Sequence, residues 1–305
     1  MSTDASELRD AGRPDAQAAR NALTGIALMC AAVFCFAGLD ATAKFLVRDL
    51  PAVQVVWMRF LTHVVLAMII FRVWRDIAIF RSRHWGLHLI RSLCLLGSTV
   101  FNFLAVRYLQ LAETVSIMFA APFVVTALAG PILGEWAGLR RWLAIAVGFL
   151  GVLVVVRPGV GGMHWAAIYS VAAMGCYAFY ALLTRKMAGT DSAAGMLIIS
   201  GAVAALAMTP VAIDAWVMPK DASTWLLLLS TGAYGSIGHL ALIQAHRLAP
   251  APLLAPFMYT QIVWMVGLGY LVFNDVPGPW TFLGAAIVVS SGLYILYRER
   301  VTGRG

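Results

Sequence analysis

The stretch ALTGIALMCAAVFCFAGLDATAKFLV, residues 22–47, is apolar except for a few polar side chains, of which only Asp40 and Lys44 are charged. A helix needs about 20 mostly apolar residues to cross a bilayer, so this stretch is long enough to span a membrane. A charge near the bilayer centre costs about 2.5–3.5 kcal/mol on insertion scales and normally faces a partner or a water-filled cavity. The stretch therefore predicts a membrane-spanning helix with two charges that need an explanation.

The rest of the chain repeats this apolar pattern. Of its 305 residues, 61% are hydrophobic and 12% are charged, and the mean hydropathy is +0.84. Soluble domains carry about 25% charged residues, which excludes that class. We predict an all-α integral membrane protein with ten transmembrane helices. Their approximate ranges are 22–46, 51–71, 85–106, 111–133, 139–156, 163–184, 193–216, 222–245, 250–273 and 279–297.

The net charge of +8 reflects topology rather than a nucleic-acid partner. Fifteen Lys and Arg residues fall on one side of the predicted helices, four fall on the other, and three lie within helices. Cytoplasmic loops carry the excess of positive charge, so we expect both termini to be cytoplasmic and the protein to lie in the inner membrane. Residues 1–20 do not have the pattern of a cleavable signal peptide. The four cysteines show no CxxC spacing, and we expect them to pack rather than bind metal.

The ten predicted helices divide into two halves of five that resemble each other. The segment 111–133 contains APF at 121–123 and is followed by GE at 134–135, while the segment 250–273 contains APF at 255–257 and is followed by ND at 274–275. The spacing from APF to the acidic residue differs between the halves, which leaves an insertion or chance open. An odd number of helices per half inverts the second half relative to the first, an architecture common in secondary transporters. The expected organisation is a cytoplasmic tail (1–20), a first repeat (21–158), a second repeat (159–297) and a second cytoplasmic tail (298–305).

The charges predicted inside the membrane favour a hydrated interior. Asp40 and Lys44 are four residues apart, so they share a helical face and can pair with each other. Arg59 and Arg91 lie on the next two predicted helices, and Asn102 follows on the third. One carboxylate cannot neutralise three cations, which favours a polar cavity lined by these residues. Two alternatives stay open: a structural ion pair that braces the helices, and long side chains that reach the interface.

The second half contributes aromatic and polar side chains to the middle of its helices. The candidates for a substrate cavity are Tyr177, Tyr180, Tyr234, His239, Tyr259 and Trp264. Such rings suit stacking on a planar ligand, and helix packing is the alternative role. On a continuous helix Tyr259 and Gln261 point about 200° apart, so we do not expect both to line one cavity.

Pro122 and Pro256 lie within two of the predicted helices and are candidate helix breaks. A proline removes one backbone hydrogen bond and permits a kink. Paired breaks in corresponding segments indicate the moving, substrate-facing part of a transporter, with a merely bent helix as the alternative.

Several stretches together resemble the EamA group of the drug/metabolite transporter superfamily. They include LDATAKFL (39–46), WMRF (57–60), RSLCLLGSTVFNFLAVRYLQLAETVSIMFAAPF (91–123), GEWAGLRRWLAIAVGFLGVLVVVRPG (134–159) and HRLAPAPLLAPFMYTQIVWMVGLGYLVFNDVPG (246–278). The resemblance covers the chain from about Asn21 to Tyr297 and implies ten helices in two inverted repeats around a central cavity. Its nearest branch includes bacterial riboflavin and S-adenosylmethionine transporters, while other members export amino acids or metallophores. Asn274-Asp275 replaces the usual Gly-Glu but keeps a carboxylate.

The resemblance and the residues together predict a secondary transporter of a small polar or aromatic metabolite, with riboflavin uptake as the leading hypothesis. S-adenosylmethionine uptake and the export of amino acids or other metabolites are alternatives. An intramembrane enzyme is disfavoured because YGSIGH (234–239) departs from the G-x-S-x-G pattern of a nucleophile elbow. A membrane scaffold is disfavoured because the polar segments are short. We expect no catalytic residue, no metal and no cofactor. The expected partners are a small-molecule substrate and the lipid bilayer, without nucleic acid, and the protein is expected to be a monomer or a homodimer.

Overall fold

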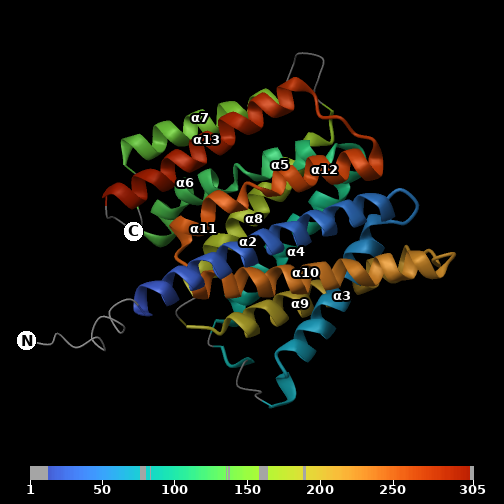
Figure 1. Cartoon of the computed structure of the whole chain (residues 1–305). Helices are drawn as coiled ribbons and strands as arrows, with labels where there is room; N and C mark the ends of the chain where they lie inside the picture. Colours follow the sequence, from blue (N-terminus) through green and yellow to red (C-terminus); the bar gives the residue numbers. More distant parts are fainter. Residues whose placement is uncertain are drawn as a thin grey trace, which may run out of the picture.

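The computed structural model describes residues 13–75, 80–82, 84–134, 136, 138–157, 164–187 and 190–302. Within these ranges the protein is helical and contains no strand (Figure 1). The helices are α2 (Arg13–Leu46), α3 (Ala52–Ile70), the 3₁₀ turn η1 (Val73–Arg75), α4 (Trp85–Tyr108), α5 (Leu111–Met118), α6 (Ala121–Leu133), α7 (Leu139–Val156), α8 (Ala167–Met187), α9 (Ala193–Asp214), α10 (Ala222–Leu248), α11 (Ala251–Met258), α12 (Gln261–Phe273) and α13 (Pro279–Thr302). The predicted tails and Glu135 lie wholly or partly outside the described residues.

The helices are long and apolar enough for a multi-pass membrane protein. Eight helical segments of the described chain have the length and hydropathy of a membrane span, and the first of them covers Ala19–Leu46. Shorter apolar helices, Trp142–Val156 and Pro279–Ile295, occupy the predicted segments 139–156 and 279–297. The all-helical membrane class predicted from composition is therefore confirmed.

Two segments predicted as single helices are each split into two by a short turn. α5 has 8 residues and α6 has 13, and α11 and α12 repeat these lengths around a turn at residues 259–260. Pro122 follows the first turn at the start of α6, where the N–H that it lacks would have bonded to a carbonyl of α5. Pro256 instead lies within α11, before the second turn. The two APF segments are therefore not at equivalent positions, although both helix pairs end in the same way.

Left-handed residues end both split helices. Gly134 follows α6 with φ 77°, and Asn274 follows α12 with φ 56°. Glycine and asparagine are the residues that best tolerate this conformation, which lets the chain turn back while the last carbonyls stay bonded. At the start of α5, the Glu113 carboxylate accepts a hydrogen bond from the Gln110 N–H at 3.0 Å, which is one half of a capping box.

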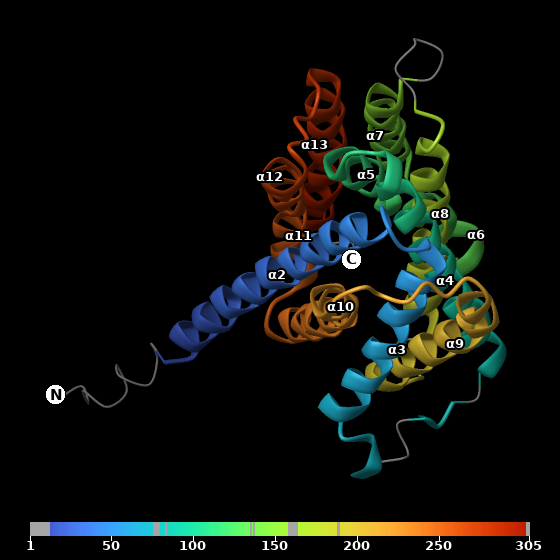
Figure 2. The same cartoon turned by 90° about the vertical axis from the view of Figure 1, so that its right-hand side faces the viewer.

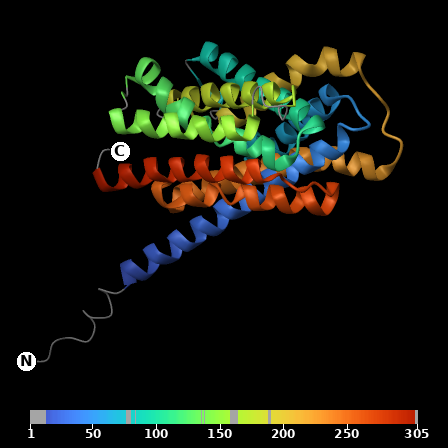
Figure 3. The same cartoon turned by 90° about the horizontal axis from the view of Figure 1, so that it is seen from above.

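The most extensive contacts join helices that are distant in the sequence. α2 packs along α10, α4 along α8 and α7 along α13, and α3 packs on both α9 and α10. Figure 2 shows α7 and α13 on one flank and α3 and α9 on the other, with α2 and α10 between them. Figure 3 shows α13 (red) and α7 (green) running side by side. The interior of the bundle is thus bounded by helices from both halves of the chain.

Polar side chains join the loops at the ends of the bundle. The amide of Gln54 bonds to both the N–H and the carbonyl of Val217, at 3.0 and 2.8 Å, and so holds α3 to the segment after α9. Before α9, the Asp191 carboxylate lies 3.1 Å from His88 Nε2. Burial alone would raise the pKa of Asp191, but hydrogen bonds from Ser82, Thr190 and His88 lower this pKa to about 2. The carboxylate therefore stays ionised at neutral pH.

Candidate functional site

A cavity of about 530 Å³ lies inside the bundle and is lined by residues of both halves. Its wall is built from α2, α3, α4, α8, α10 and α13 and from the two split helices. The predicted site residues that line it are Asp40, Arg59, Asn102, Tyr177, Tyr180, His239, Tyr259 and Pro122. Its volume falls within the 300–1,000 Å³ that is usual for small-molecule sites.

The charged part of the wall combines one carboxylate, one guanidinium and one amide. Asn102 Nδ2 donates a hydrogen bond to Asp40 Oδ1 at 2.9 Å, which joins α2 to α4. Arg59 attracts Asp40 electrostatically and is only 7% exposed, but its buried Nε has no hydrogen-bond partner in the described part of the chain. A buried donor without a partner is costly. Nε itself is shielded from the cavity, but the Arg59 side chain makes no hydrogen bond to another described residue, so its terminal nitrogens can donate to a ligand without losing an existing bond.

Aromatic side chains form another part of the wall. Tyr177 and Tyr180 lie one turn apart on α8 with their ring centroids 6.1 Å apart, and Phe119 meets Tyr259 edge to face at 5.0 Å. Tyr259 packs directly over Gly292, where an added Cβ would lie 1.8 Å from the Tyr259 hydroxyl. Because α13 has no side chain at this position, the phenol can occupy the cavity wall.

His239 reaches the cavity from α10. Its ring packs edge-on against Phe36 at 5.1 Å and lies 5.9 Å from the ring of His63. His63 is buried and bonds through Nδ1 to the Ser236 hydroxyl at 3.0 Å. Ser236 therefore meets His63 rather than His239. This hydrogen bond joins α3 to α10, and neither Ser236 nor His63 is among the residues that line the cavity.

Arg91 is buried outside the cavity wall, where its hydrogen bonds join α4 to α8 and α9. Its guanidinium donates to Thr184, to the carbonyl of Met196, to Ser200 and to Tyr180 at distances of 2.5–2.9 Å. It also lies 4.5 Å from the centre of the Tyr180 ring. The structure therefore places Arg91 behind the cavity, where it orients Tyr180.

Lys44 pairs with Asp275 rather than with Asp40, so the predicted Asp40–Lys44 pair is wrong. Lys44 Nζ lies 2.5 Å from Asp275 Oδ2 and donates to the carbonyl of Leu109 at 3.0 Å. Helical spacing places Lys44 and Asp40 on one face, but the packing of α12 beside α2 brings a carboxylate closer to the ammonium. Lys44 is thus not among the cavity-lining residues and ties three segments together.

The remaining predicted residues are also absent from the residues that line the cavity. Tyr234 packs against Gly38 of α2, where an added Cβ would lie 3.1 Å from the ring. Trp264 is 40% exposed and meets Phe34 edge to face at 4.9 Å on the outer surface. Pro256 is exposed within α11.

Gln261 lines the cavity together with Tyr259, so the prediction that only one of them could do so is wrong. That prediction assumed a continuous helix, but the turn at residues 259–260 changes the direction of α12 relative to α11. Sequence reasoning also missed Phe119 and Gly292, which line the cavity with Tyr259. Pro122, a predicted helix break, is three residues from Phe119, and this proximity was the signal that could have pointed to Phe119.

A multi-pass helical bundle around a small, partly charged cavity is typical of membrane proteins that move small molecules. The model of the EamA-like transporter family matches residues 23–157 and again residues 164–297, and the chain belongs to this family. The resemblance found in the sequence motifs is therefore confirmed, and it supports membrane transport of a small metabolite.

Individual relatives are similar over most of their length. The riboflavin transporter of Vibrio cholerae is 26% identical over 92% of this chain and 96% of its own. The S-adenosylmethionine uptake transporter of Rickettsia prowazekii is 28% identical, with coverage of 86% and 88%. The pseudopaline exporter of Pseudomonas aeruginosa is 25% identical, with coverage of 87% and 93%. A solved crystal structure shares the fold with a TM-score of 0.62 at 16% identity, over 91% of this chain and 98% of that one.

Proposed function

We propose that the protein is a secondary transporter of the inner membrane that takes up riboflavin or a comparably flat heterocycle through this cavity. The observation that carries the proposal is a wall that joins aromatic rings to the unpartnered Arg59 donor. A flat ring held against an aromatic face gains about 0.5–1.5 kcal/mol per stacked pair beyond burial. Arg59, Asn102 and His239 would bond to the polar edge of the same ligand.

We propose further that residues 21–158 and 159–297 are two inverted repeats of five helices, with the tails 1–20 and 298–305 outside them. The packing supports this. Under this proposal each helix of the first repeat corresponds to the helix five places later in the second repeat. The α2–α10 contact then corresponds to the α8–α4 contact, and the α3–α9 and α7–α13 contacts each join a helix to its own counterpart. The matching lengths of the split helices point the same way. A cavity at the interface of such repeats is the usual place for a transported substrate.

The proposed orientation places both termini in the cytoplasm and follows from the excess of Lys and Arg on that side. The pair between Lys44 and Asp275 then lies at the periplasmic end of α2 and α12. Its bond to Leu109 holds the start of the split helix α5–α6 to the same point. These contacts would keep the periplasmic end closed, and they would have to break before a substrate entered from that side.

The alternatives are S-adenosylmethionine uptake and metabolite export. Asp40 favours the first alternative, because a carboxylate in the cavity wall can neutralise a sulfonium cation. The similarity to an exporter as well as to uptake proteins favours keeping the second. An enzymatic function has no comparable observation in its favour.

Growth rescue tests the proposal. Expression in a bacterial riboflavin auxotroph that lacks its own importer should restore growth at low riboflavin concentration. Tyr259→Ala should raise the riboflavin concentration required, because it removes a cavity ring. Trp264→Ala should not, because that ring lies on the outer surface.

Absence of rescue, with membrane expression confirmed, would refute riboflavin uptake. Uptake of labelled S-adenosylmethionine into proteoliposomes would then support the alternative. An equal loss of function in Tyr259→Ala and Trp264→Ala would contradict the assignment of the cavity as the binding site.

A further inference from the structure

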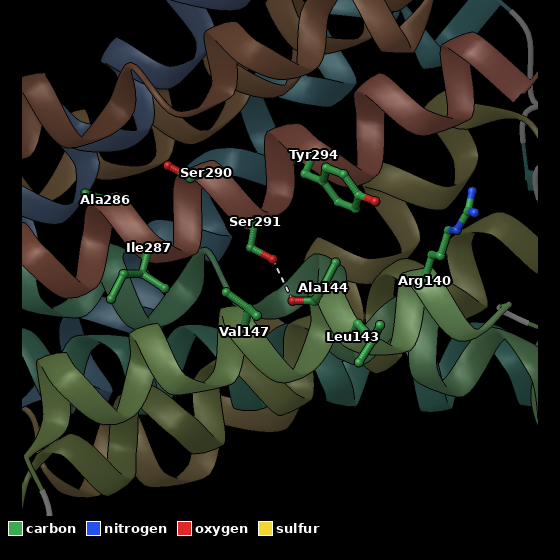
Figure 4. A pocket seen from close by; sticks show the side chains of 9 residues that line it. All are labelled: Arg140, Leu143, Ala144, Val147, Ala286, Ile287, Ser290, Ser291 and Tyr294. Carbon is green, nitrogen blue, oxygen red and sulfur yellow. Dashed lines mark hydrogen bonds between the residues drawn. The ribbon is translucent and has the colours of Figure 1, made fainter.

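A second hollow lies on the outer side of α7 and α13, away from the central cavity. This α7/α13 groove has a volume of about 570 Å³ and is lined by four residues of α7, from Arg140 to Val147, and five residues of α13, from Ala286 to Tyr294 (Figure 4). None of these residues lines the central cavity. The groove is therefore separate from the central cavity.

The groove forms because the two helices cross closely at one point and carry small residues beside the crossing. A Cβ on Gly151 would lie 2.9 Å from the Gly284 carbonyl, and one on Gly284 would lie 2.6 Å from the Gly151 carbonyl. Further along, the Ser291 hydroxyl donates to the Ala144 carbonyl at 2.6 Å, the bond drawn in Figure 4. Small residues let helix backbones approach in this way within a membrane. Where these small residues lie between larger side chains, the surface of the helix pair has an elongated apolar depression.

One end of the groove is polar and positively charged. Arg140 lies in the first turn of α7, is exposed, and has no ion-pair or hydrogen-bond partner among the described residues. Figure 4 shows the Tyr294 hydroxyl at the same end of the groove. The first turn of α7 has no acidic residue, and its N-cap, Gly138, supplies no side-chain hydrogen bond. Free N–H groups at a helix start, together with a cation, attract an anion.

We propose that the α7/α13 groove binds one anionic phospholipid from the leaflet on the Arg140 side. Its phosphate would contact Arg140 and the first N–H groups of α7, with the Tyr294 hydroxyl nearby. An acyl chain would lie along Leu143 and Val147. The order of the lining residues along the groove matches a phospholipid. Arg140 lies at the end of α7, where a headgroup would be, and the apolar lining continues into the membrane-spanning part, where an acyl chain would be.

Charge favours a lipid over a second copy of the protein. A two-fold dimer through this face would bring the same groove of both copies together, including both Arg140 side chains. Among the described residues, no carboxylate lines the groove to neutralise them. An anionic headgroup supplies the missing negative charge directly, and the cytoplasmic leaflet, on which Arg140 lies in the proposed orientation, is the anionic one.

Native mass spectrometry of the purified full-length protein tests the proposal with two probes, dioleoylphosphatidylglycerol and dioleoylphosphatidylcholine. Phosphatidylglycerol should bind as one tight equivalent above any weaker series. Arg140→Gln should weaken that binding about fivefold, the contribution of one Arg near an anionic membrane surface, and should weaken phosphatidylcholine binding less, because the choline cation opposes Arg140. Arg247→Gln is the matched control, because Arg247 is also exposed and lies at the end of α10, outside the groove.

A second variant tests the apolar part of the groove. Ser290→Phe places a ring in the groove from an exposed position and should remove the tight equivalent while the thermal unfolding temperature stays unchanged. Phosphatidylglycerol binding that is unaffected by Arg140→Gln and by Ser290→Phe would overturn the proposal. A wild-type dimer that Ser290→Phe converts to a monomer would also overturn it, in favour of a second copy.

Discussion

Arg59 and Arg91 are both buried inside membrane-spanning helices, but their surroundings differ. Arg91, at 2% exposure, has hydrogen-bond acceptors on α8 and α9 for all three of its nitrogens, and all of these acceptors are neutral. Arg59, at 7% exposure, lines the central cavity near Asp40, and its Nε has no partner in the described chain. The two arginines are thus almost equally buried, but only Arg91 has hydrogen-bond partners for all three of its nitrogens.

This difference separates a structural cation from a candidate binding cation. A buried charge is stable only if surrounding groups replace its hydration. The groups around Arg91 accept four hydrogen bonds from its five N–H donors, and they hold the guanidinium away from the cavity. Around Arg59 the replacement is incomplete, and a hydrated cavity or a substrate must supply the rest.

The largest expected effect is on folding and comes from Arg91→Leu. The change would remove all four hydrogen bonds that Arg91 donates, and each buried polar group left unsatisfied costs about 1–3 kcal/mol. We expect little folded protein by size-exclusion chromatography and a marked fall in thermal stability. The thermal stability of Arg91→Lys should be intermediate, because one ammonium can replace some of the hydrogen bonds that the guanidinium donates. A stable Arg91→Leu protein that fails to transport would break the comparison, since Arg91 would then act on substrate.

Arg59→Gln should instead lower transport while the protein stays folded. A hydrogen bond to a charged group contributes about 1.5–3 kcal/mol, so the loss of the guanidinium should reduce initial uptake into proteoliposomes by about tenfold or more. The thermal unfolding temperature should change little, because Nε of Arg59 has no bond to lose. A loss of folded yield equal to that of Arg91→Leu would show that Arg59 is also structural.

Asp40→Asn should have the smallest effect of the three, if the substrate is electron-rich. The Asn side chain has the same shape, and its amide oxygen can still accept from Asn102. We expect initial uptake of riboflavin within about threefold of wild type, in keeping with the modest net value of one hydrogen bond. A larger loss than in Arg59→Gln would favour a cationic substrate that the carboxylate neutralises, such as S-adenosylmethionine.

Much of the helix content and the break beside Pro122 were predictable from the sequence, but the position of the second break was not. Apolar runs of membrane length require helices, because only they satisfy every backbone group within lipid. The turn between Met118 and Ala121 had a local cause in Pro122, yet the equivalent turn before Gln261 has no proline at that place. Helical geometry applied across that unseen turn gave the wrong orientation for Gln261.

The sequence by itself determined the membrane class, the family and which side chains were too polar to face lipid, because these follow from composition and local spacing. Only the tertiary structure decided which of those side chains meet. Lys44 is four residues from Asp40 but bonds to Asp275, 231 residues away, because α12 packs beside α2. Partners across helices depend on rotation and depth, which helical periodicity does not encode. The cavity is therefore lined by the inward-facing side chains that remain after the other polar side chains have found partners on neighbouring helices.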